Sequence, residues 1–471
     1  MSSKYRIRFA PTLIPSLPIP PTPVSPDKSP ASLGRRAPKS RQGCHECKRR
    51  RVKCDETYPT CLRCQRRETV CRSIPRPRQW QSELLCISPQ DPDGLSVNKR
   101  LLLYWCERAC HIMGHEPDMN PMSFPIIPLL QKSPSLMHAL QSVCLAYEGF
   151  FIASENYLRE RGKAIELIQS ELMSMQQNQI VVQFLTVYLL GLSSAWLDGY
   201  QNEFGREHIL GARAIIGILV AGTVKEDDDF THFAVGAYLY WDMASSFLFE
   251  PDQQKPLDTV EMHAALQKLG KRIHPIVGNS MDLHHLLGNL GRYYRLVLDT
   301  RKRDTALEAK MEEQLLTWDS SREQTDEWKM LNGSYRLHGL ISLYRISITV
   351  PNDQDAQGET PLLQTEYNSK TRLRLYALQI LKNALRIPED SSYTIGLAIP
   401  LLTAGSELTS DDEQERAEVR SRLKAIYSLN RLPSNVMAMS LLQELWILRD
   451  AGSELSLQEL MLHKDMRLMM G

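Results

Sequence analysis

The sequence contains no recognisable catalytic motif and little sign of β-structure. The HExxH zinc-protease motif, the phosphate-binding P-loop, the nucleophile elbow and the dinucleotide-binding glycine pattern are all absent from its 471 residues. Stretches in which apolar and polar residues alternate, as a half-buried strand requires, are hard to find. These absences leave catalysis without candidate residues and favour a helical protein that is not an enzyme.

Continuous apolar runs are also scarce. The first forty residues hold nine of the chain's 27 prolines and no unbroken apolar segment of the kind that forms a secretory leader. We therefore expect the protein to occupy a reducing compartment. One stretch, from Ile180 to Leu197, is nearly all apolar, but four polar residues interrupt it and no basic flank follows. A buried core helix explains this stretch better than a membrane span does.

The charge is balanced overall but not along the chain. The net charge is +1, yet Met1 to Arg78 carry 19 Lys and Arg against 5 Asp and Glu, a charge of +14. The remaining residues carry 37 against 50, a charge of −13. A polyphosphate partner is attracted by the first part and repelled by the second. The basic N-terminal part is therefore expected to contact nucleic acid.

Six of the ten cysteines lie within twenty-eight residues, in two copies of the spacing Cys-x2-Cys-x6-Cys. Disulfides or metal ions could explain this regularity. A reducing compartment favours zinc, because a Cys-x2-Cys pair can point two thiolates at one ion. One tetrahedral ion would leave two thiolates over, and two separate sites would need eight. Two zinc ions that share two sulfurs account for all six ligands: Cys44, Cys47, Cys54, Cys61, Cys64 and Cys71.

A basic run lies between the second and third of these cysteines: Lys48, Arg49, Arg50, Arg51 and Lys53. Six thiolates and two zinc ions together carry a charge of about −2. The basic run offsets that charge, favours thiolate over thiol, and leaves a cationic excess facing outward. Because such an excess attracts phosphate, the same five residues are candidates for DNA binding.

The cysteine spacing and the order Cys-x2-Cys, basic run, Cys-Asp resemble the fungal zinc binuclear cluster family of transcription factors. The resemblance implies that each half is a short helix followed by an extended segment, and that the first and fourth cysteines bridge the metal ions. The family has a proline two residues before its fourth cysteine, and Pro59 stands at that position. The implied assignment is Cys44 and Cys61 as bridging ligands, Cys47 and Cys54 on one ion, and Cys64 and Cys71 on the other.

The same resemblance implies a mode of DNA recognition. In the family, the first helix enters the major groove end-on, and basic side chains at its tip read a CGG triplet. By resemblance, Arg50 and Arg51 take the base-reading positions, while Lys48, Arg49 and Lys53 lie nearer the phosphates. Arginine suits this role because its two donors match O6 and N7 of guanine. Relatives often have lysine at the base-reading positions, so arginine could change the preferred flanking base.

Four segments are expected. They are a disordered, proline-rich basic arm (1–40), the zinc cluster domain (41–73), a proline-containing linker (74–98) and an all-α regulatory domain (99–471). The basic residues just before Cys44, together with the basic run, could also act as a nuclear import signal. Many relatives dimerise through a coiled coil after the cluster, but four prolines between Pro75 and Pro92 exclude one here. Any dimer contact is therefore expected elsewhere, in the helical domain.

Apolar residues recur at spacings of three and four from Lys99 onward, which predicts helix after helix. The predicted helices are Lys99–Met113, Ser133–Phe151, Ser154–Met173, Gln179–Trp196, Glu203–Val220, Phe230–Phe249, Thr259–Leu269, Ser280–Thr300, Thr305–Trp318, Ser334–Ile348, Lys370–Arg386, Asp411–Leu429 and Ser434–Asp450. This layout resembles the regulatory domains of fungal-specific transcription factors. The residues that carry the resemblance are the segment that begins at Ser133 and the pattern Gly205-x-x-His208. Some members of that class bind a sterol, but no sequence feature identifies such a pocket.

Several other features have ordinary structural interpretations. The acidic segments 226–229 and 410–415 lack interleaved aromatic residues, so helix starts or solvated loops are favoured over activation segments. Cys106, Cys110, His111 and His115 lie close together in the sequence, but Gly114 breaks the helix that a metal site would need. Core cysteines and surface histidines are expected instead. The adjacent histidines His284 and His285 have no obvious partners in the sequence.

The leading hypothesis is a nuclear, sequence-specific DNA-binding regulator of RNA polymerase II genes that holds two zinc ions and reads a CGG-like triplet. Its partners would be double-stranded DNA and transcriptional co-regulators. It would bind either as a monomer on one triplet or as a dimer of two copies joined through the helical domain. One alternative is a zinc-buffering or redox-sensing thiolate protein, which would need no arginine at the helix tip. Another is an enzyme anchored to chromatin by the cluster, for which no catalytic residues are found.

Overall fold

The computed structural model describes residues 5–7, 44–54, 61–67, 69, 71, 82–84, 98–148, 154–174, 179–196, 204–222, 224, 227–351 and 362–470. Most of the predicted arm (1–40) and linker (74–98) lies outside these residues, and so do Pro59 and the basic residues that precede Cys44. The chain divides between Ser96 and Val97 into two units, which are described separately.

The first unit holds two very short helices, α1 (His45–Arg49) and α2 (Leu62–Gln65). It also holds two three-residue strands, β1 (Tyr5–Ile7) and β2 (Ser82–Leu84). The strands pair in parallel, with Tyr5 opposite Ser82 and Ile7 opposite Leu84. This pairing was not predicted, because three residues are too few to show an alternating pattern.

The regular elements of the second unit's described residues are helices, apart from an isolated β-bridge between His274 and Gly278. Its α-helices are α3 (Lys99–Glu107), α4 (Ile127–Leu130), α5 (Pro134–Glu148), α6 (Glu155–Ser174), α7 (Ile180–Trp196), α8 (Arg206–Ala221), α9 (Asp229–Ser245), α10 (Val260–Leu269), α11 (Met281–Thr300), α12 (Thr305–Thr317), α13 (Asp326–Thr349), α14 (Leu362–Arg386), α15 (Tyr393–Gly396), α16 (Ala398–Ser406), α17 (Glu413–Asn430), α18 (Pro433–Asp450) and α19 (Leu457–His463). Short 3-10 helices lie between them: η1 (Ala109–Met113), η2 (Pro117–Met119), η3 (Phe124–Ile126), η5 (Ser246–Leu248), η6 (Ser320–Arg322) and η7 (Ser410–Asp412).

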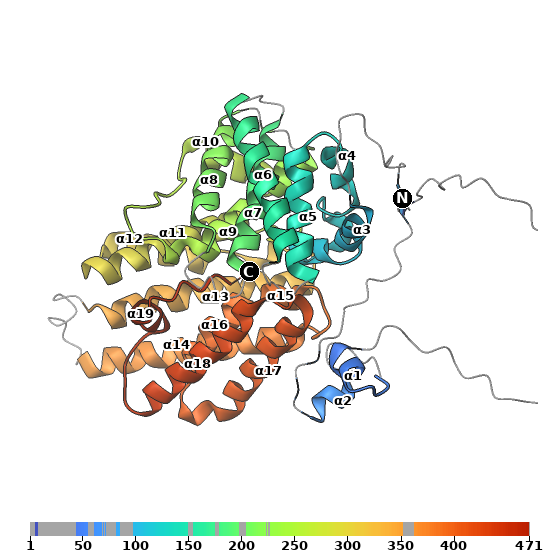
Figure 1. Cartoon of the computed structure of the whole chain (residues 1–471). Coiled ribbons are helices and arrows are strands. Elements are labelled where there is room, and N and C mark those ends of the chain that lie inside the picture. The colour runs from blue at the N-terminus through green and yellow to red at the C-terminus, as the bar shows by residue number, and fades with distance from the viewer. Residues whose placement is uncertain are drawn as a thin grey trace, which may run out of the picture. The chain divides into compact units, whose positions relative to one another are not determined.

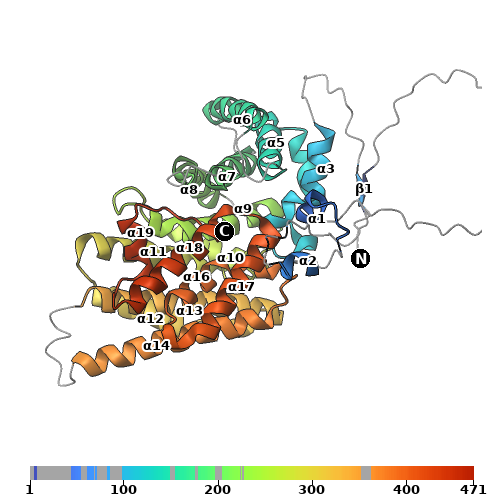
Figure 2. The ribbon, with the colours of Figure 1, turned by 60° about the horizontal axis from the view of Figure 1, so that its bottom comes forward.

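The helices of the second unit pack in two groups. Helices α5, α6, α7 and α8 pack on one another and form the first group (Figure 1). Helices α13, α14, α16, α17 and α18 form the second group, along whose edge α14 runs (Figure 2). Helix α9 contacts α7 and α8 on one side and α11 on the other, and α11 contacts α13. The two groups are therefore joined through α9 and α11.

The predicted helical domain is confirmed, with differences at individual helices. The apolar stretch from Ile180 forms α7, whose middle is buried, as a core helix requires. In the described chain, no helix combines the length and apolar character that crossing a membrane demands. The acidic segments also begin helices: Asp228 caps α9 by accepting a hydrogen bond from the Phe230 amide, and η7 leads into α17.

Some predicted helix boundaries were wrong. The helix predicted for Lys99–Met113 changes at Arg108 from α-helix to 3-10 helix. Helix α13 begins at Asp326 rather than at Ser334, because Thr325 caps it by accepting a hydrogen bond from the Trp328 amide. Helix α14 begins at Leu362 rather than at Lys370. Polar residues interspersed before each predicted start weaken the apolar periodicity on which the predictions depended.

Two glycines allow the first group of helices to pack closely. Gly205 has φ of +76°, and a Cβ there would lie 2.6 Å from the Gly191 carbonyl oxygen. A Cβ on Gly191 would lie 2.3 Å from the ring of Trp241. His208, one turn after Gly205, accepts a 2.8 Å hydrogen bond from Arg161. The pattern Gly205-x-x-His208 therefore joins α6, α7 and α8 in the core.

Buried histidines join the helices of the second unit. His274 shows why they stay neutral: its Nδ1 accepts hydrogen bonds from the Ile276 and Val277 amides, so the only ring proton is on Nε2, which donates to the Phe233 carbonyl. Burial lowers the pKa of this histidine well below its usual value. Burial also lowers the pKa of four other histidines to about 4: His115, His232, His284 and His338.

Acid should therefore destabilise the helical domain. A histidine whose folded pKa is depressed gives its full contribution to stability above the unfolded value of about 6.5. That contribution is lost as the pH falls toward the folded pKa of about 4. At pH 5 the expected loss is on the order of 1–2 kcal/mol for each such histidine. Thermal unfolding followed by circular dichroism between pH 7.5 and 5 measures it. His338→Gln should flatten the dependence, and an unchanged midpoint would contradict the prediction.

Candidate metal centre and nucleic-acid interface

The two cysteine repeats fold in the same way. In each repeat the first cysteine caps a short helix, and its sulfur accepts a hydrogen bond from the amide of the second cysteine: Cys47 N to Cys44 Sγ at 3.3 Å, and Cys64 N to Cys61 Sγ at 3.4 Å. The same backbone hydrogen bond then follows each helix. The amide of the residue five positions after the second cysteine donates to the carbonyl oxygen of that cysteine. The repeated spacing in the sequence is therefore a repeated local structure.

The six sulfurs converge between α1 and α2. The Cys44 and Cys61 sulfurs lie 3.8 Å apart, those of Cys44 and Cys64 3.7 Å apart, and those of Cys47 and Cys61 3.7 Å apart. Two sets of four sulfurs have all their members within 4.8 Å of one another. Both sets contain Cys44 and Cys61; Cys47 and Cys54 complete one, and Cys64 and Cys71 the other.

These distances fit shared metal ions and exclude disulfides. A disulfide places its sulfurs about 2.05 Å apart. Four sulfurs at about 2.3 Å from a tetrahedral zinc ion lie about 3.8 Å from one another, close to the 3.7–3.8 Å found here. Burial raises the pKa of the Cys44 and Cys61 thiols well above the usual value. Thiolates at these positions therefore need a cation, and a metal ion supplies one.

The basic run leaves the sulfurs and faces solvent. Helix α1 ends at Arg49, and Arg51 takes a left-handed conformation with φ of +54°. The chain therefore turns sharply before it returns to Cys54. All five basic residues between Cys47 and Cys54 are exposed. The arrangement places a dense cationic surface directly over the six converging sulfurs.

One carboxylate lies within this cationic surface. Glu46 accepts hydrogen bonds from Arg49, at 2.8 and 3.0 Å, and from Arg50, at 2.5 Å. The hydrogen bonds from Arg49 and then Arg50 lower the pKa of Glu46 to about 2. Glu46 is therefore ionised throughout the physiological range and holds two of the predicted DNA-binding arginines. This role was not predicted, although Glu46 lies three and four residues before the two arginines, which is the spacing of one helix face.

A second group of arginines was also missed. Helix α2 and the turn after it carry Arg63, Arg66 and Arg67, all of them exposed. Arg66 and Arg67 occupy the part of the second repeat that corresponds to the basic run of the first, and Arg63 stands at the position that corresponds to Glu46. The repeat itself was the signal that could have identified them as further phosphate contacts.

The histidine and cysteine group near residue 110 does not form a metal site. Cys106 and Cys110 are buried, as predicted, but His115 is buried as well, so its assignment to the surface was wrong. His115 packs against Trp328 and Tyr393, and its Nδ1 donates to the Ser392 carbonyl oxygen. Within the described residues, the only groups of cysteines, histidines and carboxylates with metal-ligand geometry are the two sulfur sets.

The pair at positions 284 and 285 does have partners. The Nδ1 of His284 lies 2.9 Å from the Ser280 carbonyl oxygen, and the Nε2 of His285 lies 3.3 Å from the Leu257 carbonyl oxygen. These partners come from the preceding turn and from a distant loop, so the sequence alone did not reveal them.

Residues 100–471 match the model of the fungal specific transcription factor domain. The chain belongs to this family. Residues 42–81 match the model of the fungal Zn(2)-Cys(6) binuclear cluster domain. The match to both confirms the family predicted from the cysteines and the helical pattern. The protein is accordingly a zinc-binding, DNA-binding transcription factor and not an enzyme.

Two curated relatives are similar over short stretches. A lysine biosynthesis regulatory protein of Saccharomyces cerevisiae is 56% identical over 39 residues, which are 8% of this chain and 5% of that protein. A transcriptional regulatory protein of Schizosaccharomyces pombe, moc3, is 33% identical over 64 residues, which are 14% of this chain and 13% of that protein. The chain therefore spans only a small part of the length of either relative. No solved structure matches the chain.

Replacement of Glu46 by glutamine should strengthen binding to any DNA duplex. The substitution removes one negative charge from the cationic surface and releases Arg49 and Arg50 to contact DNA. We expect a several-fold gain in affinity at low salt that shrinks as salt rises, because counterion release drives it. Fluorescence anisotropy of labelled duplexes across a salt series measures both. Glu444→Gln, which removes a charge from the helical domain, is the control and should change neither. Weaker binding by Glu46→Gln would show that the carboxylate orients the arginines productively.

Proposed function

We propose that the protein is a nuclear regulator of RNA polymerase II transcription whose zinc cluster holds two ions and reads a CGG-like triplet in the major groove. The observation that carries this proposal is the pair of four-sulfur sets joined by Cys44 and Cys61 beneath an exposed basic run. The region from about 41 to 73 is then the DNA-reading domain. The region from 99 to 471 is the regulatory domain.

The division of the six sulfurs into two sets of four supports a cluster of two ions. Each set of four provides a complete tetrahedral site, and the two sets share two sulfurs. Cys47 and Cys54 would belong to one ion and Cys64 and Cys71 to the other, with Cys44 and Cys61 bridging. The ions would supply the positive charge that six buried thiolates require. Their loss would remove the structure that orients α1.

The base-reading role is supported by the end of α1. Arg50 is the C-cap residue and Arg51 follows in the left-handed conformation, so both lie where the helix ends. An arginine here can offer two donors to O6 and N7 of a guanine. Lys48, Arg49 and Lys53 would contact phosphates on either side. Arg63, Arg66 and Arg67 would add phosphate contacts from the second repeat.

The helical domain is proposed to receive co-regulators and to join two copies of the chain. The predicted linker, where a coiled coil would lie, has prolines and is mostly outside the described residues. The net charge of −13 after Arg78 makes this domain a poor direct partner for DNA. It is therefore suited to contacts with proteins.

Cys44→Ala should abolish specific DNA binding and reduce the zinc content of the protein. Cys44 belongs to both sulfur sets, so neither set keeps four sulfurs without it. Metal analysis of the purified full chain should give two ions in the wild type, and gel-shift assays should show no specific complex for the variant. Cys106→Ala, which alters a buried cysteine of the helical domain, is the control and should retain both properties. Specific affinity that survived without zinc would contradict the proposal.

Arg51→Ala and Lys48→Ala should weaken DNA binding in different ways. Loss of a bidentate guanine contact costs about 1–3 kcal/mol and relaxes preference at one base position. Loss of a phosphate contact weakens all sequences alike and reduces the salt slope by about one. Selection from random duplex DNA with the full chain and both variants separates these outcomes.

The same selection separates the regulator from a zinc-buffering or redox-sensing thiolate protein. If the wild type holds zinc yet enriches no sequence, the regulator proposal fails. If wild type and Arg51→Ala enrich the same sequence equally, the role of Arg51 is wrong while the regulator proposal stands.

A further inference from the structure

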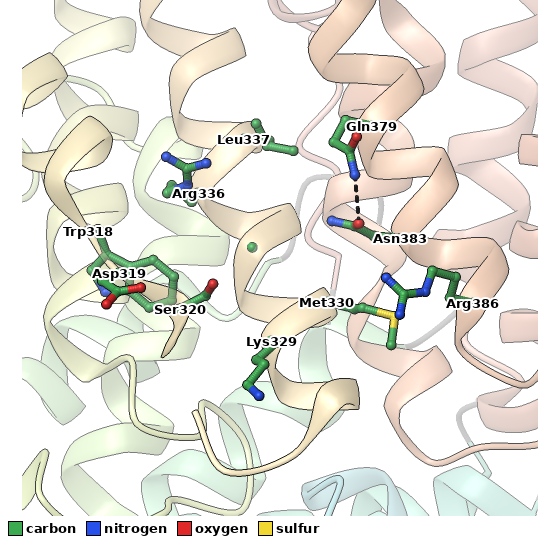
Figure 3. Close-up of a pocket in the computed structure, with 11 residues that line it drawn as sticks. Trp318, Asp319, Ser320, Lys329, Met330, Arg336, Leu337, Gln379, Asn383 and Arg386 are labelled. Carbon is green, nitrogen blue, oxygen red and sulfur yellow. Dashed lines mark hydrogen bonds between the residues drawn. The ribbon is translucent and has the colours of Figure 1, made fainter. Parts of the chain in front are cut away.

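A pocket of about 430 Å³ lies in the second unit, between α12, α13 and α14. Its lining comes from three places in the chain: the end of α12 and η6, one face of α13, and one face of α14 (Figure 3). The α13 residues are spaced at three, four and seven, and so are those of α14, so each helix contributes a single face. The volume is in the range of sites that hold small molecules, about 300–1,000 Å³.

Three cationic side chains surround the pocket. Arg336 lies on the side of Trp318, Arg386 lies on the side of α14, and Lys329 lies between them in the view (Figure 3). Asp319 is the one acidic residue of the lining, which leaves a net charge of +2. The carboxylate of Asp319 accepts hydrogen bonds from Ser321, which lower its pKa, so it stays ionised and its negative charge is already satisfied.

The two arginines have little to bind within the protein. Arg336 donates one long hydrogen bond, 3.5 Å, to the Leu315 carbonyl oxygen, although a guanidinium has five N–H donors. Among the described residues no carboxylate lies within 4.0 Å of Arg336 or Arg386, whereas many other arginines of the helical domain are paired with carboxylates. Lys329 has only a 3.5 Å contact with an exposed Asp326.

The rest of the lining suits the body of a small organic molecule. Trp318, Met330 and Leu337 are apolar, and Gln379 and Asn383 add amide groups, joined to each other by a 3.0 Å hydrogen bond. Gly333 lies at the pocket in the interior of α13, where glycine costs about 1 kcal/mol relative to alanine. The nearest atom to a Cβ at this position would be 3.8 Å away, on Asn383. Neighbouring residues therefore leave room for a side chain, and close packing does not explain the glycine.

We propose that this pocket binds a small organic anion with at least two acidic groups, such as a dicarboxylic acid or a sugar bisphosphate. Acidic groups at the two ends of the ligand would engage Arg336 and Arg386, which approach the pocket from different helices. The occupant would connect α13 with α14 and so stabilise the second group of helices. A docked protein segment is disfavoured, because a stable protein interface buries about 800 Å² on each partner.

The test uses the zinc-loaded full chain and calorimetric titration with four probes: inorganic phosphate, succinate, citrate and glucose 1,6-bisphosphate. Glucose and succinamide are the neutral counterparts. We expect saturable binding of at least one organic anion at millimolar concentration or below, a matching rise in the unfolding midpoint, and no response to its neutral counterpart. Arg336→Gln and Arg386→Gln should each weaken binding at least about tenfold, the loss of one charge-assisted contact.

Two further variants separate a built site from a general salt effect. Gly333→Met fills the pocket without a clash at Cβ and should abolish binding while retaining the fold and DNA binding. Lys382→Gln removes a cation of α14 that does not line the pocket and should leave binding unchanged. The proposal is overturned if no probe binds, or if the three variants of the lining, Arg336→Gln, Arg386→Gln and Gly333→Met, bind as the wild type does. It is also overturned if an oligoglutamate peptide binds more tightly than every small acid, which would identify a peptide site.

Discussion

The mutual approach of six buried sulfurs is the constraint on which the N-terminal unit depends. Helices of five and four residues are far too short to be stable alone. In the described part of this unit, the only buried hydrophobic cluster consists of the six cysteines. A conventional core is thus replaced by sulfur. Since thiolates at such distances repel one another, the fold of this unit and its binding of metal are one process.

This constraint also determines where the proposed DNA-binding groups lie. The cysteines on either side of the basic run are tied to the sulfur sets, so the intervening residues must turn within a short distance. The left-handed Arg51 is part of that turn. The side chains between Cys47 and Cys54 cannot pack inward, because sulfur fills the interior, and they form the exposed cationic surface. Glu46 moderates its charge by holding two of the arginines.

The helical unit is stabilised in a different way. Its core contains large aromatic side chains, including Trp105, Trp241 and Trp328, together with buried neutral histidines and paired arginines. It therefore has enough buried surface to fold without metal. The first unit depends on metal, whereas the second has a core of its own. The two units can therefore respond to separate signals. Through the cationic pocket between α13 and α14, a small anion would act on the helical domain without any change in zinc binding.

Local pattern by itself determined the chemical identity of this protein. The spacing of the cysteines, the basic run and the period of apolar residues are all short-range features, and they specified the family, the ligand set as a hypothesis, and most of the helices. Short helices such as α16 were missed, because a nearly all-apolar segment of nine residues shows no period. Helix α19 was missed as well, although its capping box of Ser456 and Glu459 was readable. Only the tertiary structure decided that His115 is buried and that Arg336 and Arg386 face one pocket. Such outcomes depend on contacts between residues that are fifty to nearly three hundred positions apart, and no local period or spacing encodes them.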